Sequence, residues 1–447
     1  MPAEAADDPT NDDPPEAADG AALASAAAHP ATPRPPSVDR LARELASSGL
    51  PHPLLVEVAR EAIAAGDVAS AATRARAWQR RLLQPVVNAT GVLLHTNLGR
   101  APLAHHQDAT YTNLEFRLSD GRRGSRSDHV AALWARACGA EAALVVNNCA
   151  SAVLLTLAAL GAGRAVAVSR SELVEIGGGF RVPDVMAQSG ADLVEVGTTN
   201  RTRLADFERA IAAHGDRLAL VLKVHQSNYR IVGFTETVEV PELARLGRTV
   251  VADIGSGLVD AACPWLRDGP PGWLAGEPAA RQTLASGADL VLFSGDKLAG
   301  GPQAGIIAGR ADLVAACGRH PLARALRPGG LVLAALQDLA LAYLDRRGAD
   351  IPFWRMASLD VAALHGRARS LGVGAPTDLA AVPGGGTLPG VEIPSAGVAV
   401  QGDHAAALRS LPRPIIARVE AGATLLDLRT VDPADDGHVA ASLRQLG

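Results

Sequence analysis

The sequence is poor in lysine and in aromatic residues. Of its 42 basic side chains, two are lysines, Lys223 and Lys297, and Phe, Trp and Tyr together make up 3% of the 447 residues. No uninterrupted apolar run reaches the roughly 18 residues that a membrane-spanning helix needs. The first residues are acidic, whereas a secretory signal peptide begins with basic ones. We therefore expect a cytoplasmic protein with no membrane partner.

Cysteine is also scarce, and its number and spacing argue against a cysteine-bound metal and against a disulfide framework. The four cysteines form no C-x-x-C pair and are too few for a disulfide framework; they are Cys138, Cys149, Cys263 and Cys317. This pattern is typical of reduced thiols in a cytosolic protein. We therefore predict neither a metal site nor a disulfide-stabilised fold.

The composition is otherwise that of a globular protein. With 48% hydrophobic and 20% charged residues, the chain can bury a large core, and its length suggests two or three domains. The formal charge of -5 arises largely from the first twenty residues, which hold seven acids and no Lys or Arg. The rest of the chain is close to neutral, so any nucleic-acid partner needs a local basic patch.

Composition and periodicity divide the chain into four segments. Residues 1–36 are rich in Ala, Pro and Asp and are expected to be a disordered tail. Residues 37–84 show helical spacing after Ser37 and predict a small helical domain. Residues 85–332 are predicted to form the large catalytic domain, and residues 333–447 a smaller α+β domain.

The predicted helical domain ends in a basic segment that contains no acid between Ser70 and Pro85. Its arginines are candidates for contacts with the phosphates of a nucleic acid: Arg74, Arg76, Arg80 and Arg81. A solvated linker helix explains the same pattern equally well, so both interpretations stay open.

From Glu141 onward, short apolar runs alternate with helical segments, as the βαβ units of a mostly parallel sheet require. The runs that we expect to be strands are ALVVN, AVAV, DLVEV, LALVLKV, TVVAD and DLVLF. In sheets of this kind ligands bind at the carboxyl ends of the strands. The polar residues that follow each run are therefore the first candidates for a site.

A polar turn follows the run DLVLF and is closed by two glycines. Its notable residues are Ser294, Asp296, Lys297, Gly300 and Gly301. Because Arg supplies almost every other positive charge, a lysine at position 297 suggests that the protein needs an amine there. A partly desolvated lysine can lose its proton and form a Schiff base, whereas a guanidinium cannot. We therefore predict that Lys297 binds pyridoxal 5'-phosphate; a solvated turn lysine is the simpler alternative, and Lys223, inside a predicted strand, is the weaker candidate.

Two further groups of residues fit a cofactor site with Lys297. Small residues precede the helix AVLLTLAAL and leave its first N–H groups open to a phosphate: Asn148, Cys149, Ala150 and Ser151. Asp253 ends the run TVVAD, where a carboxylate can pair with a pyridinium nitrogen, and His225 follows the run LALVLKV. A phosphate-binding helix start, then an acid, then a lysine is the order used by aminotransferase-like (fold type I) pyridoxal phosphate enzymes. We predict this α/β fold.

Two arginines beyond the lysine suggest that a second anion is bound. Arg324 and Arg327 are three residues apart, which is one turn of a helix, so both side chains can face one anion. Two exposed helix charges explain this spacing about as well.

Long sequence strings carry a resemblance to a known family. They are HTNLGRAPL, GRRGSR, VVNN, SRSELVEIGGGFRVPDVM, VGTTNRT, KVHQSNY, GFTE, DIGSGLVD and FSGDKLAGGPQAGI. Between about residues 37 and 431 the chain resembles bacterial selenocysteine synthase, the L-seryl-tRNA(Sec) selenium transferase. The resemblance implies β-elimination of the hydroxyl of tRNA-bound serine to an aminoacrylyl intermediate, which then accepts selenium from selenophosphate.

The resemblance also implies roles in the cofactor site. Lys297 would form the Schiff base, Asp253 would pair with the pyridine nitrogen, and Ser294 would join the helix start in binding the phosphate. Asp296 would either tune Lys297 or assist the departing hydroxyl, and the residues do not choose between these two roles.

Further expectations concern the substrates and the assembly. Arg100, Arg324 and Arg327 match the family positions expected to bind the phosphate of selenophosphate. By resemblance, the N-terminal helical domain would hold the tRNA. The family assembles from dimers into a ring, a decamer in typical bacterial members, so we expect a homo-oligomer.

Two rival interpretations remain. A paralogue would keep the pyridoxal phosphate site but act as a lyase or transferase on a small amino substrate, without dependence on tRNA. A non-catalytic module would bind tRNA or the cofactor without turnover.

Overall fold

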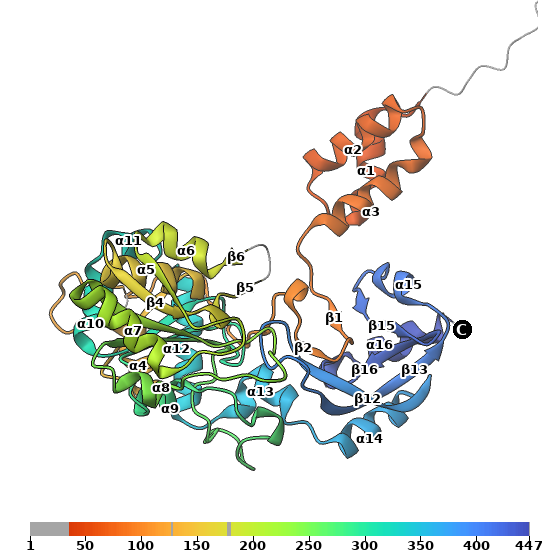
Figure 1. Ribbon diagram of the computed structural model, residues 1–447. Coiled ribbons are helices and arrows are strands. Elements are labelled where there is room, and N and C mark those ends of the chain that lie inside the picture. Colours follow the sequence, from red (N-terminus) through yellow and green to blue (C-terminus); the bar gives the residue numbers. More distant parts are fainter. Residues whose placement is uncertain (1–34, 127, 177–179, 447) are drawn as a thin grey trace, which may run out of the picture. The chain divides into compact units, whose positions relative to one another are not determined.

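The computed structural model describes residues 35–126, 128–176 and 180–446 (Figure 1). Contacts divide the chain into two compact units, one ending at Gln84 and the other beginning at Pro85. Most of the predicted N-terminal tail, residues 1–36, lies outside the described residues. In the part of the chain that is described, no helix combines the length and the apolarity needed to cross a membrane.

The N-terminal unit is built from three helices, α1 (Val38–Glu44), α2 (His52–Ala64) and α3 (Ala71–Arg81). Ser37 caps α1, where its hydroxyl accepts a hydrogen bond from the Arg40 N–H at 3.3 Å. The apolar faces of the helices pack together around Val58 and Ala59, which are fully buried. The four arginines of the basic segment therefore lie on α3, outside this small core.

The second unit contains a seven-stranded sheet in the order β3-β11-β10-β9-β8-β4-β7. Its strands are β3 (Ala142–Val146), β4 (Ala165–Ser169), β7 (Asp192–Val196), β8 (Leu218–Val224), β9 (Thr249–Gly255), β10 (Leu290–Ser294) and β11 (Gly305–Gly309). β11 runs antiparallel to both of its neighbours, and the pairs from β10 to β7 are parallel. The predicted α/β fold with a mostly parallel sheet is therefore confirmed.

The predicted strands match the observed ones to within two residues because most of the runs are largely apolar. Strands that are covered on both faces need continuous hydrophobic runs rather than alternation. β4, β10 and β11 are buried at every position. TVVAD continues for two residues beyond its predicted end, so Asp253 lies within β9 rather than after it.

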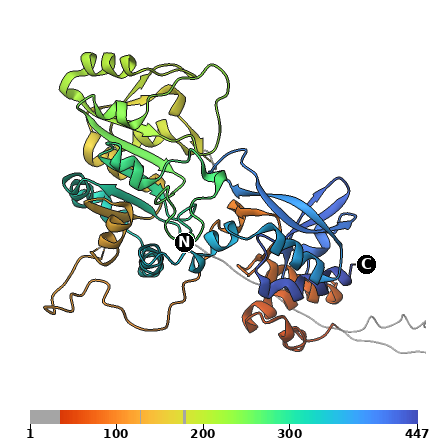
Figure 2. The same ribbon diagram turned by 90° about the horizontal axis from the view of Figure 1, so that it is seen from below.

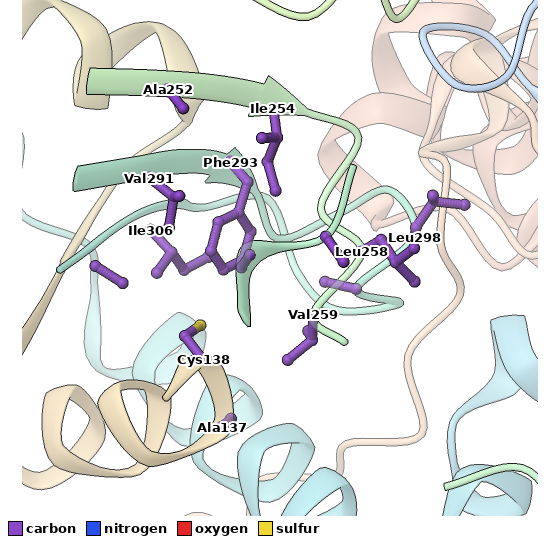
Figure 3. Packing of buried hydrophobic residues seen from close by; sticks show 14 of the residues in the cluster. Ala137, Cys138, Ala252, Ile254, Leu258, Val259, Val291, Phe293, Leu298 and Ile306 are labelled. Atoms are coloured by element: carbon purple, nitrogen blue, oxygen red, sulfur yellow. The ribbon is translucent and has the colours of Figure 1, made fainter. Parts of the chain in front are cut away.

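Helices cover both faces of the sheet (Figure 1). One face packs against α5 (Cys149–Gly161), α6 (Val182–Ser189) and α10 (Ala311–Arg319). The other packs against α4 (Asp128–Cys138), α7 (Leu204–His214), α8 (Val240–Ala244), α9 (Ala280–Ala285) and α12 (Gly330–Leu344). In Figure 3, Phe293 and Ile306 extend from the strands toward Cys138 of α4. These contacts fix β9 and β10, the two strands that lead to the candidate site.

A second sheet has five strands in the order β15-β16-β13-β12-β2. The strands are β2 (Val92–Leu94), β12 (Ala375–Gly384), β13 (Ile393–Gln401), β15 (Arg418–Glu420) and β16 (Ala423–Asp427), and α14 (Val361–Leu371) and α16 (Asp436–Arg444) pack against them. β2 precedes the whole central sheet in the chain and pairs in parallel with β12. The segment around β2 thus connects the two sheets.

The boundary predicted at residues 332/333 falls inside α12. Buried side chains of this helix and of α13 (Pro352–Ala357) belong to the core of the central sheet. The second sheet and its helices have a separate hydrophobic cluster, to which Leu364 of α14 belongs.

The remaining elements are short. They are β1 (Val87–Asn88), β5 (Glu175–Ile176), β6 (Phe180–Arg181), α11 (Pro321–Ala325), α15 (Ala405–Arg409) and β14 (Ile415–Ile416). Between Ala101 and Arg126 the chain forms a long loop (Figure 2), in which Phe116 and Arg123 make one isolated β-bridge. This loop leads from β2 to α4.

Candidate active site

Lys297 is buried in the turn that follows β10. Its residue exposure is 4%, and its Nζ donates a hydrogen bond to the Gly386 carbonyl oxygen at 3.3 Å. Gly386 has a φ of +80°, and a Cβ added there would lie 3.1 Å from Nζ. The amine is therefore enclosed between the turn and the β12–β13 connection, and the alternative of a solvated turn lysine is wrong.

Backbone contacts hold the turn in shape. The Gly300 N–H donates to the Lys297 carbonyl and the Gly301 N–H donates to the Gly295 carbonyl, each at 2.8 Å. A Cβ on Gly301 would meet Leu339 at 2.4 Å, so the backbone packs directly on α12. Because both amides are already hydrogen-bonded, these glycines shape the loop around Lys297 and have no free N–H to offer a phosphate.

Asp253 lies in the adjacent strand and is 6% exposed. The β9–β10 register shifts between Leu292, which pairs with Asp253, and Phe293, which pairs with Gly255. Asp253 Oδ1 accepts hydrogen bonds from the Gly255 N–H at 3.0 Å and from the thiol of Cys149 at 3.4 Å. The carboxylate is thus fixed by its own strand and by the start of α5.

Burial dominates the electrostatics of this pair. It raises the pKa of Asp253, while the positive charge of Lys297 acts in the opposite direction. Burial also lowers the pKa of Lys297, against the opposing charge of Asp253. A neutral amine at Lys297 is accordingly accessible at lower pH than for an ordinary lysine, which is what a nucleophilic amine requires.

The N-terminus of α5 lies beside these two residues. Asn148 caps the helix, and its Oδ1 accepts a hydrogen bond from the Ser151 N–H at 2.8 Å. The N–H groups of Cys149 and Ala150, in the first turn, have no carbonyl of their own helix to bind. A Cβ on Gly305 would lie 2.2 Å from the Asn148 carbonyl oxygen, so β11 packs tightly against this turn. The arrangement is suited to an anion.

The Cys149 side chain connects the helix start to the rest of the site. Burial raises the pKa of Cys149 well above that of a free thiol, with Asp253 adding to the effect and a hydrogen bond from Ser294 opposing it. The thiol therefore stays protonated and donates to the Asp253 carboxylate. Ser294 ends β10 and is itself buried. The structure thus brings together four of the predicted site residues, Cys149, Asp253, Ser294 and Lys297.

Arg100 and Asp296 form an ion pair on the far side of the lysine. Arg100 Nη1 lies 2.7 Å from Asp296 Oδ2, and the side chains are 25% and 9% exposed. The Ala101 N–H also donates to the Asp296 carbonyl oxygen at 3.3 Å. The charge of Arg100 is among those that lower the pKa of Lys297, after the larger effect of burial.

Arg324 and Arg327 are placed differently from the prediction. Helix α11 ends at Ala325, so Arg327 lies beyond the helix and the two side chains do not share a helical face. Both are exposed, and Arg327 Nη1 lies 3.7 Å from Glu115 Oε1.

The segment that carries Arg327 nevertheless reaches the start of α5. The Asn147 N–H, directly before the helix cap, donates to the Leu326 carbonyl oxygen at 2.9 Å. Arg126 also approaches this segment, because its Nη1 donates to the Pro328 carbonyl at 3.3 Å. Glu115 accepts hydrogen bonds from Arg123 and Arg126 and also faces Arg327, so three arginines surround one acid near the start of α5.

Lys223 has a structural partner instead. Its Nζ lies 2.6 Å from Glu172 Oε1 and 2.9 Å from Thr237 Oγ1. Glu172 is buried and also accepts a hydrogen bond from the Val224 N–H at 2.9 Å. This ion pair accounts for a lysine at position 223 without any role in binding a cofactor.

A cavity of about 890 Å³ opens at the carboxyl ends of β4, β8 and β9. Asp253, His225 and Glu277 are among the residues that line it. Glu277 and Gly386 were missed by sequence reasoning, because each lies in a loop without a recognisable motif. The cavity provides space for a substrate next to the buried acid.

The fold defines the class of the protein. The structure is similar to that of D-glucosaminate-6-phosphate ammonia-lyase, with a TM-score of 0.56 and 20% identity, covering 83% of this chain and 97% of that one. This likeness concerns the fold alone. With its mostly parallel sheet, the chain has the aminotransferase-like (fold type I) α/β architecture.

The sequence comparisons identify the family. The model of the L-seryl-tRNA selenium transferase family matches residues 86–432. The L-seryl-tRNA(Sec) selenium transferase of Geobacter metallireducens is 45% identical over 394 residues, covering 81% of this chain and 83% of that protein. Those of Moorella thermoacetica and Hyphomonas neptunium are 46% and 44% identical, covering 82% and 86% of this chain and the same shares of their own. The chain belongs to the L-seryl-tRNA selenium transferase family.

Proposed function

We propose that this enzyme converts L-seryl-tRNA(Sec) to L-selenocysteinyl-tRNA(Sec), with selenophosphate as the selenium donor. The Cβ–O bond of the seryl group is broken and a Cβ–Se bond is formed, while the donor's phosphorus exchanges selenium for oxygen and leaves as phosphate. The observation that carries the proposal is the buried amine of Lys297 beside Asp253 and the α5 start, in a chain that belongs to this family.

The residues of the site fit pyridoxal phosphate. Lys297 supplies an amine with a lowered pKa, Asp253 a buried carboxylate, and the first turn of α5 with Ser294 an anion cradle. When bound, the cofactor supplies an aldehyde for an amine and a ring that stabilises negative charge at the α-carbon of the substrate. His225 lines the adjoining cavity and is proposed to contact the cofactor. Gly300 and Gly301 would contribute through the shape of the loop.

Lys297 is proposed to move the proton of the α-carbon. Its amine is held at Gly386 by a single long hydrogen bond, so it is free to exchange partners once substrate enters. Asp296 is held by Arg100, which keeps a carboxylate next to the lysine in a fixed orientation. We propose that this carboxylate assists the departure of the seryl hydroxyl, because its pairing with Arg100 orients it without occupying both of its oxygens.

Arg100, Arg324 and Arg327 are proposed to bind the donor. Arg100 contacts Asp296 through one of its nitrogens, and its Nε is buried without a hydrogen-bond partner in the described structure. The side chains of Arg324 and Arg327 are exposed and can change conformation, whereas that of Arg100 is held by Asp296. A guanidinium binds phosphate oxygens in a bidentate geometry, so we assign Arg100 to orient the donor and the other two to recruit it.

The N-terminal unit is proposed to bind the tRNA through α3. Arg76, Arg80 and Arg81 are exposed, and Arg74 lies 3.7 Å from Glu61 of α2. The Arg81 guanidinium also lies 5.4 Å from the centre of the Trp78 ring, which presents a flat surface at the end of the helix. Phosphate contacts from such a helix add affinity without sequence specificity. We further propose a homo-oligomer built from dimers, a decamer as in typical family members.

The half-reaction tests the proposal most simply. Enzyme loaded with cofactor and given seryl-tRNA(Sec) without donor should dehydrate the seryl group, which yields pyruvate after hydrolysis. Free serine and seryl-tRNA(Ser) serve as comparison substrates and should yield much less. Pyruvate from free serine at an equal rate would favour the paralogue that acts on a small amino substrate, and no pyruvate from any substrate would favour the non-catalytic module.

The roles of the exposed arginines are tested by adding donor. Replacing Arg324 and Arg327 together with Ala should slow selenium addition and leave the dehydration half-reaction intact. Loss of dehydration instead would show that these residues serve the tRNA or the cofactor.

A further inference from the structure

His225 and Glu277 lie next to each other in the lining of the large cavity. His225 Nε2 lies 3.4 Å from Glu277 Oε2, and the side chains are 27% and 3% exposed. Two of their atoms, His225 Nε2 and Glu277 Oε1, are buried without a hydrogen-bond partner in the described structure. A buried carboxylate with so few partners is costly, and such groups in proteins usually have a functional reason.

The backbone, rather than the side chain, fixes the position of Glu277. The Glu277 N–H donates to the Leu274 carbonyl at 3.0 Å, and the Ala280 N–H donates to the Leu258 carbonyl at 2.8 Å. Ala279 and Leu258 also form a parallel β-bridge. Leu258 belongs to the segment that leaves β9 just after Asp253. The loop that carries Glu277 is thus attached to the strand that carries the acid of the active site.

His225 is fixed relative to the same acid. Its N–H donates to the Asp253 carbonyl oxygen at 2.8 Å, so the two residues are neighbours at the ends of β8 and β9. Burial raises the pKa of Asp253, and the charges of Lys297 and His225 act against that effect. The imidazole is therefore close to two buried carboxylates, that of Asp253 and that of Glu277, and all three residues line the same cavity.

We propose that Glu277 is a positioning residue, whose carboxylate accepts the Nε2–H of His225 and holds the imidazole ring against the cofactor and substrate beside Asp253. The inference rests on the proposed function, because it assigns a purpose to the ring in that reaction. In the substrate-bound enzyme the long 3.4 Å contact shortens to a hydrogen bond, as catalytic hydrogen bonds often do when substrate binds.

Other charged groups also line the same cavity. They are Glu172, Lys223, Arg230, Glu236, Glu239 and Asp253. Glu172 and Lys223 pair with each other at 2.6 Å, and Glu236 pairs with Arg203 at 2.9 Å. Glu195, which does not line this cavity, provides the control, since its pair with Arg170 is exposed and has little energetic value.

The test compares Glu277→Leu with Glu277→Gln in the full-length enzyme. Leu removes the acceptor, and Gln retains a carbonyl oxygen at the same place. We expect Glu277→Leu to lower kcat about tenfold and to weaken binding of pyridoxal phosphate by the apo-protein about tenfold, the effect of one lost charge-assisted hydrogen bond. KM for seryl-tRNA(Sec) and the melting temperature should change little. Glu277→Gln should recover most of the loss, and Glu195→Gln should match the wild type.

A double-mutant comparison links the effect to the imidazole. His225→Gln alone should reproduce the loss in kcat, and adding Glu277→Leu to it should cause no further loss. The proposal is overturned if the two losses multiply, if His225→Gln keeps full activity, or if Glu277→Gln is as impaired as Glu277→Leu. It is also overturned if Glu277→Leu only lowers the melting temperature.

The outcomes separate this inference from the proposed function. If the wild-type enzyme forms no selenocysteine, the proposed function fails, yet the series of cofactor affinities still tests whether Glu277 acts through His225. If Glu277→Leu does not fold, the comparison of Glu277→Gln with His225→Gln decides, because the proposal requires the first to be active and the second to be impaired.

Discussion

Arg100 and Asp296 form an ion pair that spans 196 positions of the sequence, with Nη1 and Oδ2 2.7 Å apart. Arg100 holds this position with a left-handed backbone, at a φ of 64°. Such a backbone costs a residue other than glycine about 1–2 kcal/mol. The pair ties the loop after β2 to the turn that carries Lys297, and thereby connects both sheets to the buried amine of Lys297.

Replacing Arg100 with Ala should therefore lower the stability of the protein as well as its activity. Asp296 would remain buried without its partner, at an expected loss of about 1.5–3 kcal/mol in the free energy of unfolding. Urea denaturation measures this loss. Arg217→Ala is the control, since Arg217 and Asp192 are 66% and 59% exposed and their pair should contribute under about 1 kcal/mol. Equal losses in both variants would contradict the assigned role.

The two-lysine composition permits a direct test of the cofactor lysine. Protein incubated with pyridoxal phosphate and reduced with borohydride should carry a pyridoxyl group on the peptide that contains Lys297. The peptide with Lys223 should stay unmodified, because that amine is paired with Glu172. Lys297→Ala should remove the label and Lys223→Arg should keep it. Label on the Lys223 peptide, measured by mass spectrometry, would reassign the site.

The pH dependence of this labelling should respond to the neighbouring charges. Only the neutral amine reacts, and burial lowers the pKa of Lys297, so half-maximal labelling should occur at a lower pH than for a free lysine. The Asp253 carboxylate raises the pKa of Lys297 and Arg100 lowers it. Asp253→Asn should therefore shift the midpoint to lower pH, and Arg100→Ala should shift it to higher pH. Shifts in the same direction would contradict this electrostatic account.

Gly386 offers a probe of the space around the amine. Its φ is +80°, and a Cβ there would come within 3.1 Å of Lys297 Nζ. Gly390 has a φ of +75° with nothing within 4 Å of its added Cβ. Ala at either position should cost about 1 kcal/mol of stability through backbone strain. Only Gly386→Ala should also slow the labelling of Lys297, and equal labelling in the two variants would show that the contact does not matter.

The Lys223–Glu172 pair should be essential to stability. Lys223→Met leaves Glu172 buried and unpaired, which should cost about 3–5 kcal/mol at neutral pH. Burial raises the pKa of Glu172, against the charge of Lys223. The loss should therefore shrink as the pH falls and Glu172 takes up a proton. Urea denaturation at several pH values measures it, with Arg170→Met at the exposed Arg170–Glu195 pair as the control. A loss that is independent of pH would mean that packing, not charge, is responsible.

Much of the central sheet was predictable because its strands are buried on both faces. The run LALVLKV coincides with the observed strand β8, and the other predicted runs match their strands to within two residues. The turn with Lys297 and the start of α5 follow two of these strands, so their positions could be inferred as well. The physical reason is that a buried strand needs a run of apolar residues and its exposed end needs polar ones. Both are visible in a short stretch of sequence.

Contacts between distant segments were not predictable in the same way. The pairing of β2 with β12 places residues 92–94 in the second sheet, although the sequence around them suggested the large domain. Arg327 looked like a helical partner of Arg324, but α11 ends at Ala325 just before Leu326 and Pro328. Glu277 lies in a loop that carries no sequence motif. A β-bridge between Leu258 and Ala279, which are distant in the sequence, determines where this loop lies. Such features depend on which surfaces meet in three dimensions.

The central claim is best tested by the product on the tRNA. Purified enzyme loaded with pyridoxal phosphate is incubated with seryl-tRNA(Sec) and selenophosphate, and the amino acid released from the tRNA is identified by mass spectrometry. The account predicts selenocysteine from the wild-type enzyme and unchanged serine from Lys297→Ala. Recovery of serine alone would contradict it, provided that borohydride treatment of a separate sample of the same wild-type preparation places the label on Lys297.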